Sequence, residues 1–163
     1  MIYRIMKHIK LFEDYSNKYK TIVILGLPGS GKSHLANKIL KENPDRNYVI
    51  YDDNEWMGRN TPGGIGGIDK IGTENQIVSD GTLVEYFTEH SIRKMGEDKG
   101  ADVEFIYFEN DPEKALHNAK KRWESGEAKS YQDEKHMVHS IGSRTRSYVI
   151  PKDVTPLPIW LRP

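Results

Sequence analysis

Short apolar runs alternate with longer stretches in which apolar residues recur every three or four positions. Residues 21–25 form a continuous run of β-branched and aliphatic side chains, typical of a strand buried on both faces of a parallel sheet. Further short strands are predicted at 48–51, 76–79 and 103–108. Strands separated by helical spacing predict βαβ units, in which each helix connects two parallel strands.

Helix start and stop signals follow the first and the third predicted strands. A helix is predicted to begin near Lys32 and to end at Asn43-Pro44, because proline cannot continue it. Residues 82–85 have the spacing of a capping box, which predicts a second helix that runs past Met95. Each helix would pack its apolar positions against the sheet.

Two more helices are predicted after the fourth strand. Asp111 supplies an N-cap and Pro112 a first-turn proline, and the helix they open places Ala119 and Trp123 on one apolar face. A further cap signal at 130–133 precedes another helix.

Together these elements predict an α/β fold, a three-layer α/β/α sandwich with a mostly parallel sheet, in a domain spanning residues 21–150. Residues 1–20 are interpreted as an N-terminal extension, and 151–163 as a Pro-rich C-terminal tail that Trp160 pins to the domain. No run approaches the roughly 20 apolar residues of a membrane span, and no signal-type segment is present. We therefore expect a cytoplasmic protein without a membrane partner, and nothing in the chain indicates an obligate protein partner.

Residues 26–33 read Gly-Leu-Pro-Gly-Ser-Gly-Lys-Ser and match the phosphate-binding pattern G-x-x-x-x-G-K-[ST] at every fixed position. Glycines let successive backbone N–H groups approach phosphate oxygens, and the following helix adds the positive end of its dipole. Lys32 is predicted to reach the outer phosphates of ATP, and the Ser33 hydroxyl to ligate Mg²⁺. The fold prediction therefore sharpens to a P-loop NTPase. The residues predicted to bind the nucleotide are Gly26, Pro28, Gly29, Ser30, Gly31, Lys32, Ser33 and His34.

Charge and composition narrow the choice of partners only slightly. The chain has 24 basic and 24 acidic residues and no cysteine, so a uniformly basic surface for nucleic acid and a thiolate metal site are excluded. Acidic residues gather in the middle of the chain, between positions 48 and 113, and the remaining segments are basic. A local basic cleft stays open as a prediction.

Phosphoryl transfer needs a base near the acceptor hydroxyl and ligands for the metal, and three aspartates are placed to supply them. Asp52 and Asp53 follow the second predicted strand, at the edge where open α/β sheets bind ligands. Asp52 is predicted to accept the proton of the attacking hydroxyl, whereas capping of the next helix is the alternative for either residue. Asp80 ends the third strand in the manner of a Walker B element and is predicted to serve Mg²⁺ or substrate.

A cluster of cations, Lys120-Lys121-Arg122, ends the predicted helix that follows the fourth strand. It resembles the lid of small P-loop kinases, which places cations over the β- and γ-phosphates. An arginine fork suits phosphate oxygens, so Arg122 is the best candidate of the three. The alternative is that these cations only complement the dipole at the end of a helix.

These motifs together resemble the kinase domain of the phage polynucleotide 5′-hydroxyl kinase family, over roughly residues 21–126. In that family the loop reads G-x-P-G-S-G-K-S, as it does here, and the first aspartate of an Asp-Asp pair after the second strand is the general base. The resemblance implies this role for Asp52, contact with the acceptor for Asp80, and the lid role for Arg122. Asp53, the second aspartate of the pair, is predicted to bind the substrate. ATP, Mg²⁺ and a DNA or RNA acceptor are the ligands that it implies.

One position departs from the family pattern. The family carries an arginine three residues after the base, and this chain has Glu55 there, with Arg59 as the candidate substitute for binding the acceptor. A related group, the phage kinases that phosphorylate hydroxymethyl groups of modified pyrimidines in DNA, is also small and single-domain. The Gly-rich segment 61–67 is a candidate for shaping such an acceptor site, or a surface loop.

Two other functional classes use the same scaffold. A nucleoside, nucleotide or other small-molecule kinase is favoured by the acidic middle of the chain, whereas the basic C-terminal part favours a polyanionic acceptor. A P-loop ATPase or switch is less well supported, because there is no N-K-x-D sequence and no second domain to move. His136 and His139, three residues apart on a predicted helix, are interpreted as a solvated face and not as metal ligands.

Overall fold

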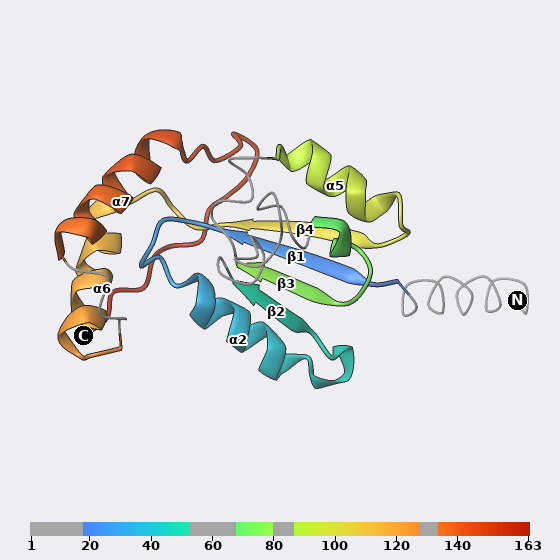
Figure 1. Ribbon diagram of the computed structural model, residues 1–163, viewed down its shortest axis with the longest axis horizontal. Coiled ribbons are helices and arrows are strands. Elements are labelled where there is room, and N and C mark those ends of the chain that lie inside the picture. Colours follow the sequence, from blue (N-terminus) through green and yellow to red (C-terminus); the bar gives the residue numbers. More distant parts are fainter. Residues whose placement is uncertain (1–17, 53–67, 80–86, 128–133) are drawn as a thin grey trace, which may run out of the picture.

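The computed structural model describes residues 18–52, 68–79, 87–127 and 134–163. In the described part of the chain, an α-helix separates β1 from β2 and another separates β3 from β4, as the sequence predicts, and two helices follow the last strand (Figure 1). Short 3-10 turns occur at Pro44–Arg46 and Ile68–Lys70. The main elements are β1 (Lys20–Leu25), α2 (Lys32–Glu42), β2 (Val49–Asp52), β3 (Gln76–Ser79), α5 (Glu89–Glu97), β4 (Asp102–Tyr107), α6 (Pro112–Glu124) and α7 (Glu134–Ser147).

The four described strands form one sheet in the order β2-β3-β1-β4, and every pairing is parallel. β1 lies inside the sheet, between β3 and β4, and its last five residues are buried, as its continuous apolar run predicts. The predicted α/β class is therefore confirmed, with a sheet that is parallel throughout the described strands. The bounds of β1, β2 and β4 differ from the predicted ones by a single residue, and those of β3 agree.

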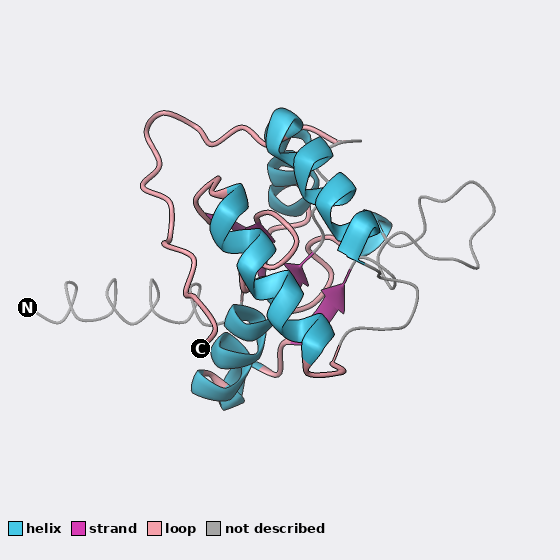
Figure 2. Ribbon diagram, turned by 90° about the vertical axis from the view of Figure 1, so that its left-hand side faces the viewer, coloured by secondary structure: helices cyan, strands magenta, loops and turns pink. Residues whose placement is uncertain are grey.

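Helices cover both faces of this sheet. Alternate residues of β1 point to opposite faces, so the two sets of side chains pack against different helices. Ile22 and Ile24 pack in a cluster with α2, α6 and α7, whereas Val23 and Leu25 pack in a second cluster with α5. Figure 1 shows α2 below the strands and α5 above them, and Figure 2 shows the helices around the sheet from the side. Right-handed crossovers explain this placement, since the connections from β1 and from β3 run in opposite directions across the sheet.

The C-terminal tail runs beside β4 as a partial fifth strand. Leu157 forms a parallel bridge with Phe108: its N–H donates to the Tyr107 carbonyl and its carbonyl accepts from the Glu109 N–H, both at 2.8 Å. The prediction that Trp160 pins the tail is wrong, because 69% of that side chain is exposed, whereas Ile159 before it is only 4% exposed. Ile159 fills the apolar cluster on the α2 side of the sheet.

Two helix predictions also need correction. The helix that carries Met95 begins at Glu89, where Thr88 is its N-cap and accepts from the Ser91 N–H, and not at residue 82. Residues 80–86 lie outside the described part of the chain. Trp123 is 47% exposed and does not share the burial of Ala119, because it lies in the last turn of α6, beyond the packed part of the helix.

Candidate functional site

The predicted phosphate loop connects the buried end of β1 to the first residue of α2. Gly26 continues the buried strand, and a Cβ there would collide with the Ser30 hydroxyl and press on Phe108. The Ser30 N–H donates to the Leu27 carbonyl at 3.1 Å, which closes the turn. The absence of a side chain at Gly26 therefore allows the loop to turn this tightly.

Two further glycines have backbone conformations that other residues rarely adopt. Gly29 has φ +86° and Gly31 φ +102°, both in the left-handed region. A Cβ at Gly29 would also strike the backbone carbonyl of Ala115 on α6, whereas at Gly31 it would meet only the Phe108 ring, at 3.9 Å. Gly29 is thus fixed by both its conformation and its neighbour.

The start of α2 is well suited to bind an anion. Gly31 occupies the N-cap position without a side chain to cap the helix, and the first turn contains no acidic residue. The N–H groups of a first turn have no partner within the helix, and the helix dipole makes this end electropositive. The first turn consists of residues from Lys32 onward, and the side chains of Ser33 and His34 are exposed there.

Lys32 extends back across the loop from this first turn. Its ammonium donates to the carbonyls of Gly26 at 3.0 Å and Leu27 at 3.1 Å, which holds a positive charge over the concave side of the loop. The Ser30 hydroxyl is almost fully buried and has no hydrogen-bond partner within the described part of the chain. This oxygen is packed against Gly26, on the inside of the turn.

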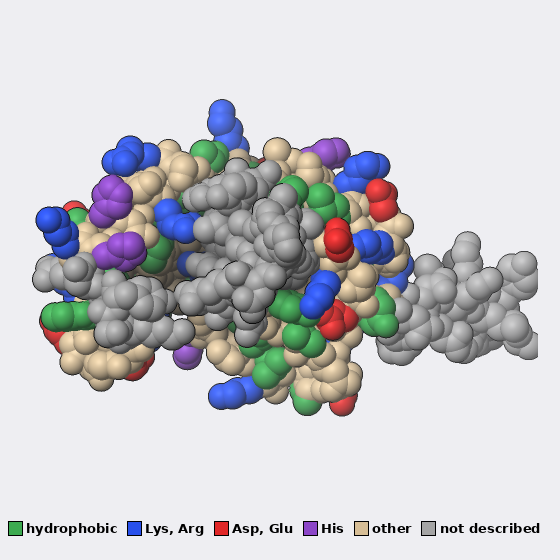
Figure 3. Space-filling model, viewed as in Figure 1, with side chains coloured by type: hydrophobic (Ala, Val, Ile, Leu, Met, Phe, Trp, Pro, Cys, Tyr) green, Lys and Arg blue, Asp and Glu red, His purple; other side chains and the backbone are tan. Residues whose placement is uncertain are grey.

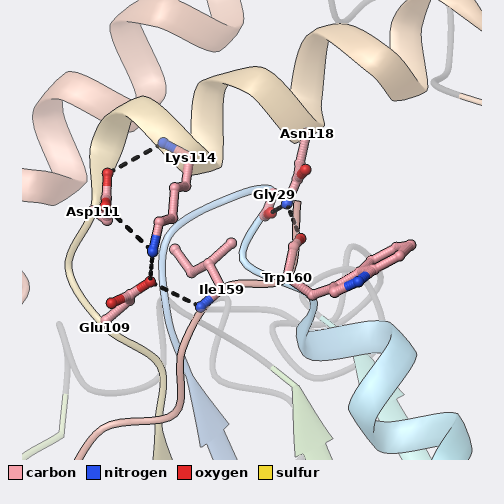
Figure 4. A network of polar contacts seen from close by, with 7 residues as sticks. All are labelled: Gly29, Glu109, Asp111, Lys114, Asn118, Ile159 and Trp160. Atoms are coloured by element: carbon pink, nitrogen blue, oxygen red, sulfur yellow. Dashed lines mark hydrogen bonds and ion pairs between the residues drawn. The ribbon is translucent and has the colours of Figure 1, made fainter. Parts of the chain in front are cut away.

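Helix α6 supports the loop from the other side. Asn118 is 3% exposed, and its side-chain amide donates to the Gly29 carbonyl at 3.0 Å and to the Trp160 carbonyl at 2.8 Å. Its side-chain oxygen accepts from the Arg162 N–H at 2.8 Å. One buried amide therefore joins the phosphate loop, α6 and the C-terminal tail, as Figure 4 shows.

A second polar cluster anchors the same tail near the start of α6. Asp111 caps the helix by accepting from the Lys114 N–H at 3.1 Å, as predicted. The Lys114 ammonium is 2.7 Å from the Glu109 carboxylate, which also accepts from the Ile159 N–H at 2.9 Å (Figure 4). These two hydrogen bonds, that from Lys114 first, hold the pKa of the Glu109 carboxyl below its usual value.

Tyr148, just after α7, completes the support. Its hydroxyl donates to the Phe108 carbonyl at 2.6 Å and lies 3.2 Å from the Leu25 carbonyl, where β1 and β4 end. Burial raises the pKa of this hydroxyl, so it remains a protonated donor at neutral pH. Sequence reasoning identified none of Asn118, Glu109 and Tyr148, because each acts on a segment far away in the chain.

Arg122, the predicted lid cation, is exposed on α6, one turn beyond Asn118. Helical periodicity places it on the same face as Ala115, the residue whose carbonyl lies against Gly29. Its carbonyl accepts from the Ser125 hydroxyl at 3.0 Å, which helps to end the helix. The Cα of Arg122 is therefore on the loop side of α6, and no described contact joins its side chain to the loop.

The aspartates predicted for the acceptor side are only partly described. Asp52 is the last residue of β2 and pairs in register with Ser79, the last residue of β3, so the backbone positions agree with the prediction. Since neighbouring strands lie about 4.8 Å apart, the end of β2 is about 10 Å from the end of β1, across β3. Asp53, Arg59 and Asp80 lie outside the described residues.

Histidines and carboxylates do not gather into a metal site in the described ranges. No group of three His, Cys, Asp or Glu side chains there could hold a metal ion. His136 and His139 are both exposed on α7. In the same ranges, no helix has the length and apolar character required to cross a bilayer.

Comparison with known proteins finds similarity among solved structures. No protein-family profile and no curated protein matches the chain. Among solved structures, the crystal structure of APE1195 matches with a TM-score of 0.44 and 16% sequence identity, over 82% of this chain and 98% of that chain. The function of the site must therefore be argued from its own residues.

Proposed function

We propose that this protein is an ATP-dependent kinase that transfers the γ-phosphoryl group to a hydroxyl on a nucleic acid. The phosphate loop is the observation that carries the proposal. It combines the complete G-x-x-x-x-G-K-S pattern, glycines at Gly26 and Gly29 whose Cβ positions are blocked, the Lys32 ammonium held against the loop and an uncapped helix start. Each of these features is what a polyphosphate requires, and together they fit ATP.

The sheet topology supports the same location. Connections leave β1 and β3 toward opposite sides of the sheet, so the crevice between the ends of these two strands is a topological switch point. Ligands of open α/β sheets bind at such points, outside the carboxyl ends of the strands. The phosphate loop follows β1, and Asp80 is the first residue after β3.

The residues of the loop would divide the binding of ATP and Mg²⁺ among them. Backbone N–H groups between Gly26 and Ser33 would hold the phosphates, and Lys32 would exchange its loop carbonyls for the outer phosphate oxygens. The Ser33 hydroxyl and Asp80 are the proposed Mg²⁺ ligands. The metal would supply neutralisation of the charge on the phosphates.

Transfer would then need an activated hydroxyl in line with the γ-phosphoryl group. Asp52 is the proposed base: it takes the proton as the acceptor oxygen forms its bond to phosphorus and the bond to the bridging oxygen of ADP breaks. The end of β2 lies about 10 Å from the end of β1, across β3, and this is the separation that the phosphates and the acceptor would span. Arg122 is the proposed cation for the developing charge.

A nucleic-acid acceptor is favoured over a small one by the charge of the helices beside the site. Lys and Arg side chains, together with exposed histidines, lie on the α6 and α7 end of the molecule, at the left of the view in Figure 3, and further Lys and Arg side chains lie at its right. The exposed cations there include Arg122, Lys135 and Arg146. Cations beside a transfer site attract the phosphate backbone of a polynucleotide.

The test is transfer of labelled γ-phosphate from ATP with Mg²⁺ to a panel of acceptors. The panel holds 5′-hydroxyl DNA and RNA, end-blocked DNA with hydroxymethylpyrimidine, and free nucleosides and nucleotides. We expect label on one of the nucleic acids, either at 5′ ends or on the modified bases. Label on small molecules alone would move the protein to the small-molecule kinases, and ADP release without a labelled acceptor would make it an ATPase.

Two variants test the assigned roles in the same assay. Lys32→Ala is expected to lower the transfer rate by at least about 100-fold, as loss of a charge-stabilising group does in other enzymes. Asp52→Asn is expected to bind ATP with unchanged affinity and to lose transfer. Lys38→Ala, an exposed lysine on the same helix α2, is the matched control and should transfer at the rate of the unmodified protein. Full activity of Asp52→Asn would remove the base assignment.

A further inference from the structure

Trp160 is an exposed tryptophan on a backbone that is fixed on both sides. Its side chain is 69% exposed, although the preceding Ile159 is buried and donates its N–H to Glu109. The Trp160 carbonyl accepts from the Asn118 side-chain amide, and two residues later the Arg162 N–H donates to the Asn118 side-chain oxygen. The tail thus holds this indole in solvent at a defined place.

That place is beside the phosphate loop. The amide nitrogen of Asn118 that binds the Trp160 carbonyl is the same atom that binds the Gly29 carbonyl. Figure 4 shows the indole pointing away from this polar network and from α6, on the side of the loop where α2 begins. The largest exposed aromatic surface of the tail therefore borders the residues that would bind the phosphates of ATP.

Anchoring of the tail does not require a tryptophan at this position. Ile159 provides the buried apolar contact, and the hydrogen bonds of Trp160 come from its backbone, so any residue could make them. An indole kept in water gains nothing from the hydrophobic effect until something covers it. Nucleobases are suitable partners, because their flat faces stack on tryptophan, tyrosine and arginine side chains.

We propose that Trp160 is the stacking surface for the base of the nucleotide whose phosphates the loop binds. This inference rests on the proposed nucleotide-binding function and adds a base-binding residue to it. Stacking uses the face of the base and not its hydrogen-bonding edge, so Trp160 would contribute affinity for purine nucleotides without selecting adenine over guanine.

Calorimetric titration with ATP and with inorganic tripolyphosphate separates the base from the phosphates. Trp160→Ala is expected to weaken ATP binding by roughly 5- to 150-fold, the range that one base–aromatic stack provides, and to leave tripolyphosphate binding unchanged. Trp160→Phe keeps an aromatic face and should restore most of the ATP affinity, whereas Trp160→Leu should not. Leu161→Ala, which removes the neighbouring exposed apolar side chain, is the matched control for a disturbed tail.

Each other outcome overturns a different statement. Equal losses for ATP and tripolyphosphate in Trp160→Ala would mean that the residue supports the loop instead of the base, and no loss for either would remove it from the site. Restoration by leucine as complete as by phenylalanine would replace stacking with simple apolar contact. Failure of the unmodified protein to bind tripolyphosphate and ATP at all would overturn the nucleotide-binding function itself.

Discussion

At the carboxyl end of the sheet, the polar groups that face the proposed ligand are mostly backbone groups. At the amino end, the polar groups are charged side chains that pair with one another. The amino end has a cavity of about 480 Å³, lined by Lys18, Lys20, Arg46, Glu97, Gly100, Ala101 and Asp102. There the Lys20 ammonium lies 2.8 Å from Glu104 and 4.0 Å from Asp102. At the carboxyl end the Lys32 ammonium instead lies against two carbonyl oxygens.

This difference shows that a hollow and a cation are not sufficient to identify an anion site. Carboxylates beside Lys20 already neutralise its charge, so an incoming phosphate would have to compete with them. The first turn of α2 carries no acid, and its helix dipole and Lys32 act in the same direction. The comparison therefore favours the carboxyl end as the functional one, and matched variants at the two ends can test it.

Glycines with left-handed backbones occur at both ends and should respond very differently to alanine. Gly29→Ala combines φ +86° with a collision between the new Cβ and the Ala115 carbonyl, so α6 must move away from the loop. Gly100→Ala, at φ +81°, meets nothing within 4 Å. We expect Gly29→Ala to lower the free energy of unfolding by about 3 kcal/mol and to abolish ATP binding, and Gly100→Ala to cost only about 1 kcal/mol.

Denaturant unfolding and ATP titration of both variants are the measurements. Gly100→Ala is the control for the conformational cost alone, since the two φ values are within a few degrees of each other. Equal destabilisation of the two proteins, with ATP binding retained in both, would show that α6 does not determine the shape of the phosphate loop.

A buried or half-buried asparagine bridges separate segments at each end, which gives a second matched pair. Asn118 joins Gly29 to the tail, and Asn75 accepts from the Lys20 N–H at 2.8 Å and donates to the Arg46 carbonyl at 2.7 Å. Replacement of either asparagine by alanine leaves backbone groups without partners, so the free energy of unfolding should fall by about 2 kcal/mol. Only Asn118→Ala is expected to weaken ATP binding, by roughly tenfold, because only that residue touches the loop.

Thermal unfolding and ATP titration of the pair would measure both effects. A loss of ATP affinity in Asn75→Ala as large as in Asn118→Ala would mean that affinity follows general stability and not the position of the loop. Unchanged affinity in both variants would limit Asn118 to holding the tail.

The parts of this molecule that depend on local sequence were predictable. The β-branched run of β1, the glycine pattern of the loop and the Asp111-Pro112 helix start each determine a structure within a few residues, and all three have their predicted form. The end of β2 at Asp52 agrees as well, because an apolar run followed by two aspartates marks a strand end. In these cases the observed bounds of each element differ from the predicted ones by at most one residue.

Contacts between distant segments were not predictable from the sequence alone. Trp160 was expected to be the anchor of the tail because tryptophan is the largest apolar side chain there, yet Ile159 takes the buried position. The register of the bridge between Leu157 and Phe108 decides which of the two points inward, and periodicity does not contain that register. In the sequence alone Asn118 does not differ from other polar helix residues, because its role depends on contacts with the loop and the tail.

Protonation of Glu109 at low pH should weaken the attachment of the C-terminal tail at the carboxyl end of the sheet. Its pKa is lowered in the folded protein by Lys114 and then by the Ile159 N–H, so the stabilisation is present above the ordinary glutamate pKa of about 4.3 and is lost as the pH falls through the lowered value. Glu109→Gln should therefore cost about 1 kcal/mol at pH 7 and progressively less below about pH 4. Unfolding of both proteins by urea between pH 7 and pH 3 measures this, and a difference independent of pH would exclude the ion pair as its cause.

The smallest effect is expected at the amino end, from Lys20→Met. Burial is the largest single influence and lowers the pKa of Lys20, but the hydrogen bond to Glu104 together with the nearby charges of Glu104 and Asp102 outweighs it, so the pKa of the ammonium is raised in the folded state. Its contribution to stability is therefore present below the unfolded lysine pKa of about 10.4 and is lost only as the pH rises further. A partly exposed ion pair contributes less than about 1 kcal/mol, and methionine retains most of the apolar stem, so stability at pH 7 should change by less than that. ATP and tripolyphosphate should bind Lys20→Met as they bind the unmodified protein. A loss of affinity for either ligand in that titration would move the anion site to the amino-end cavity and reverse the comparison between the two ends of the sheet.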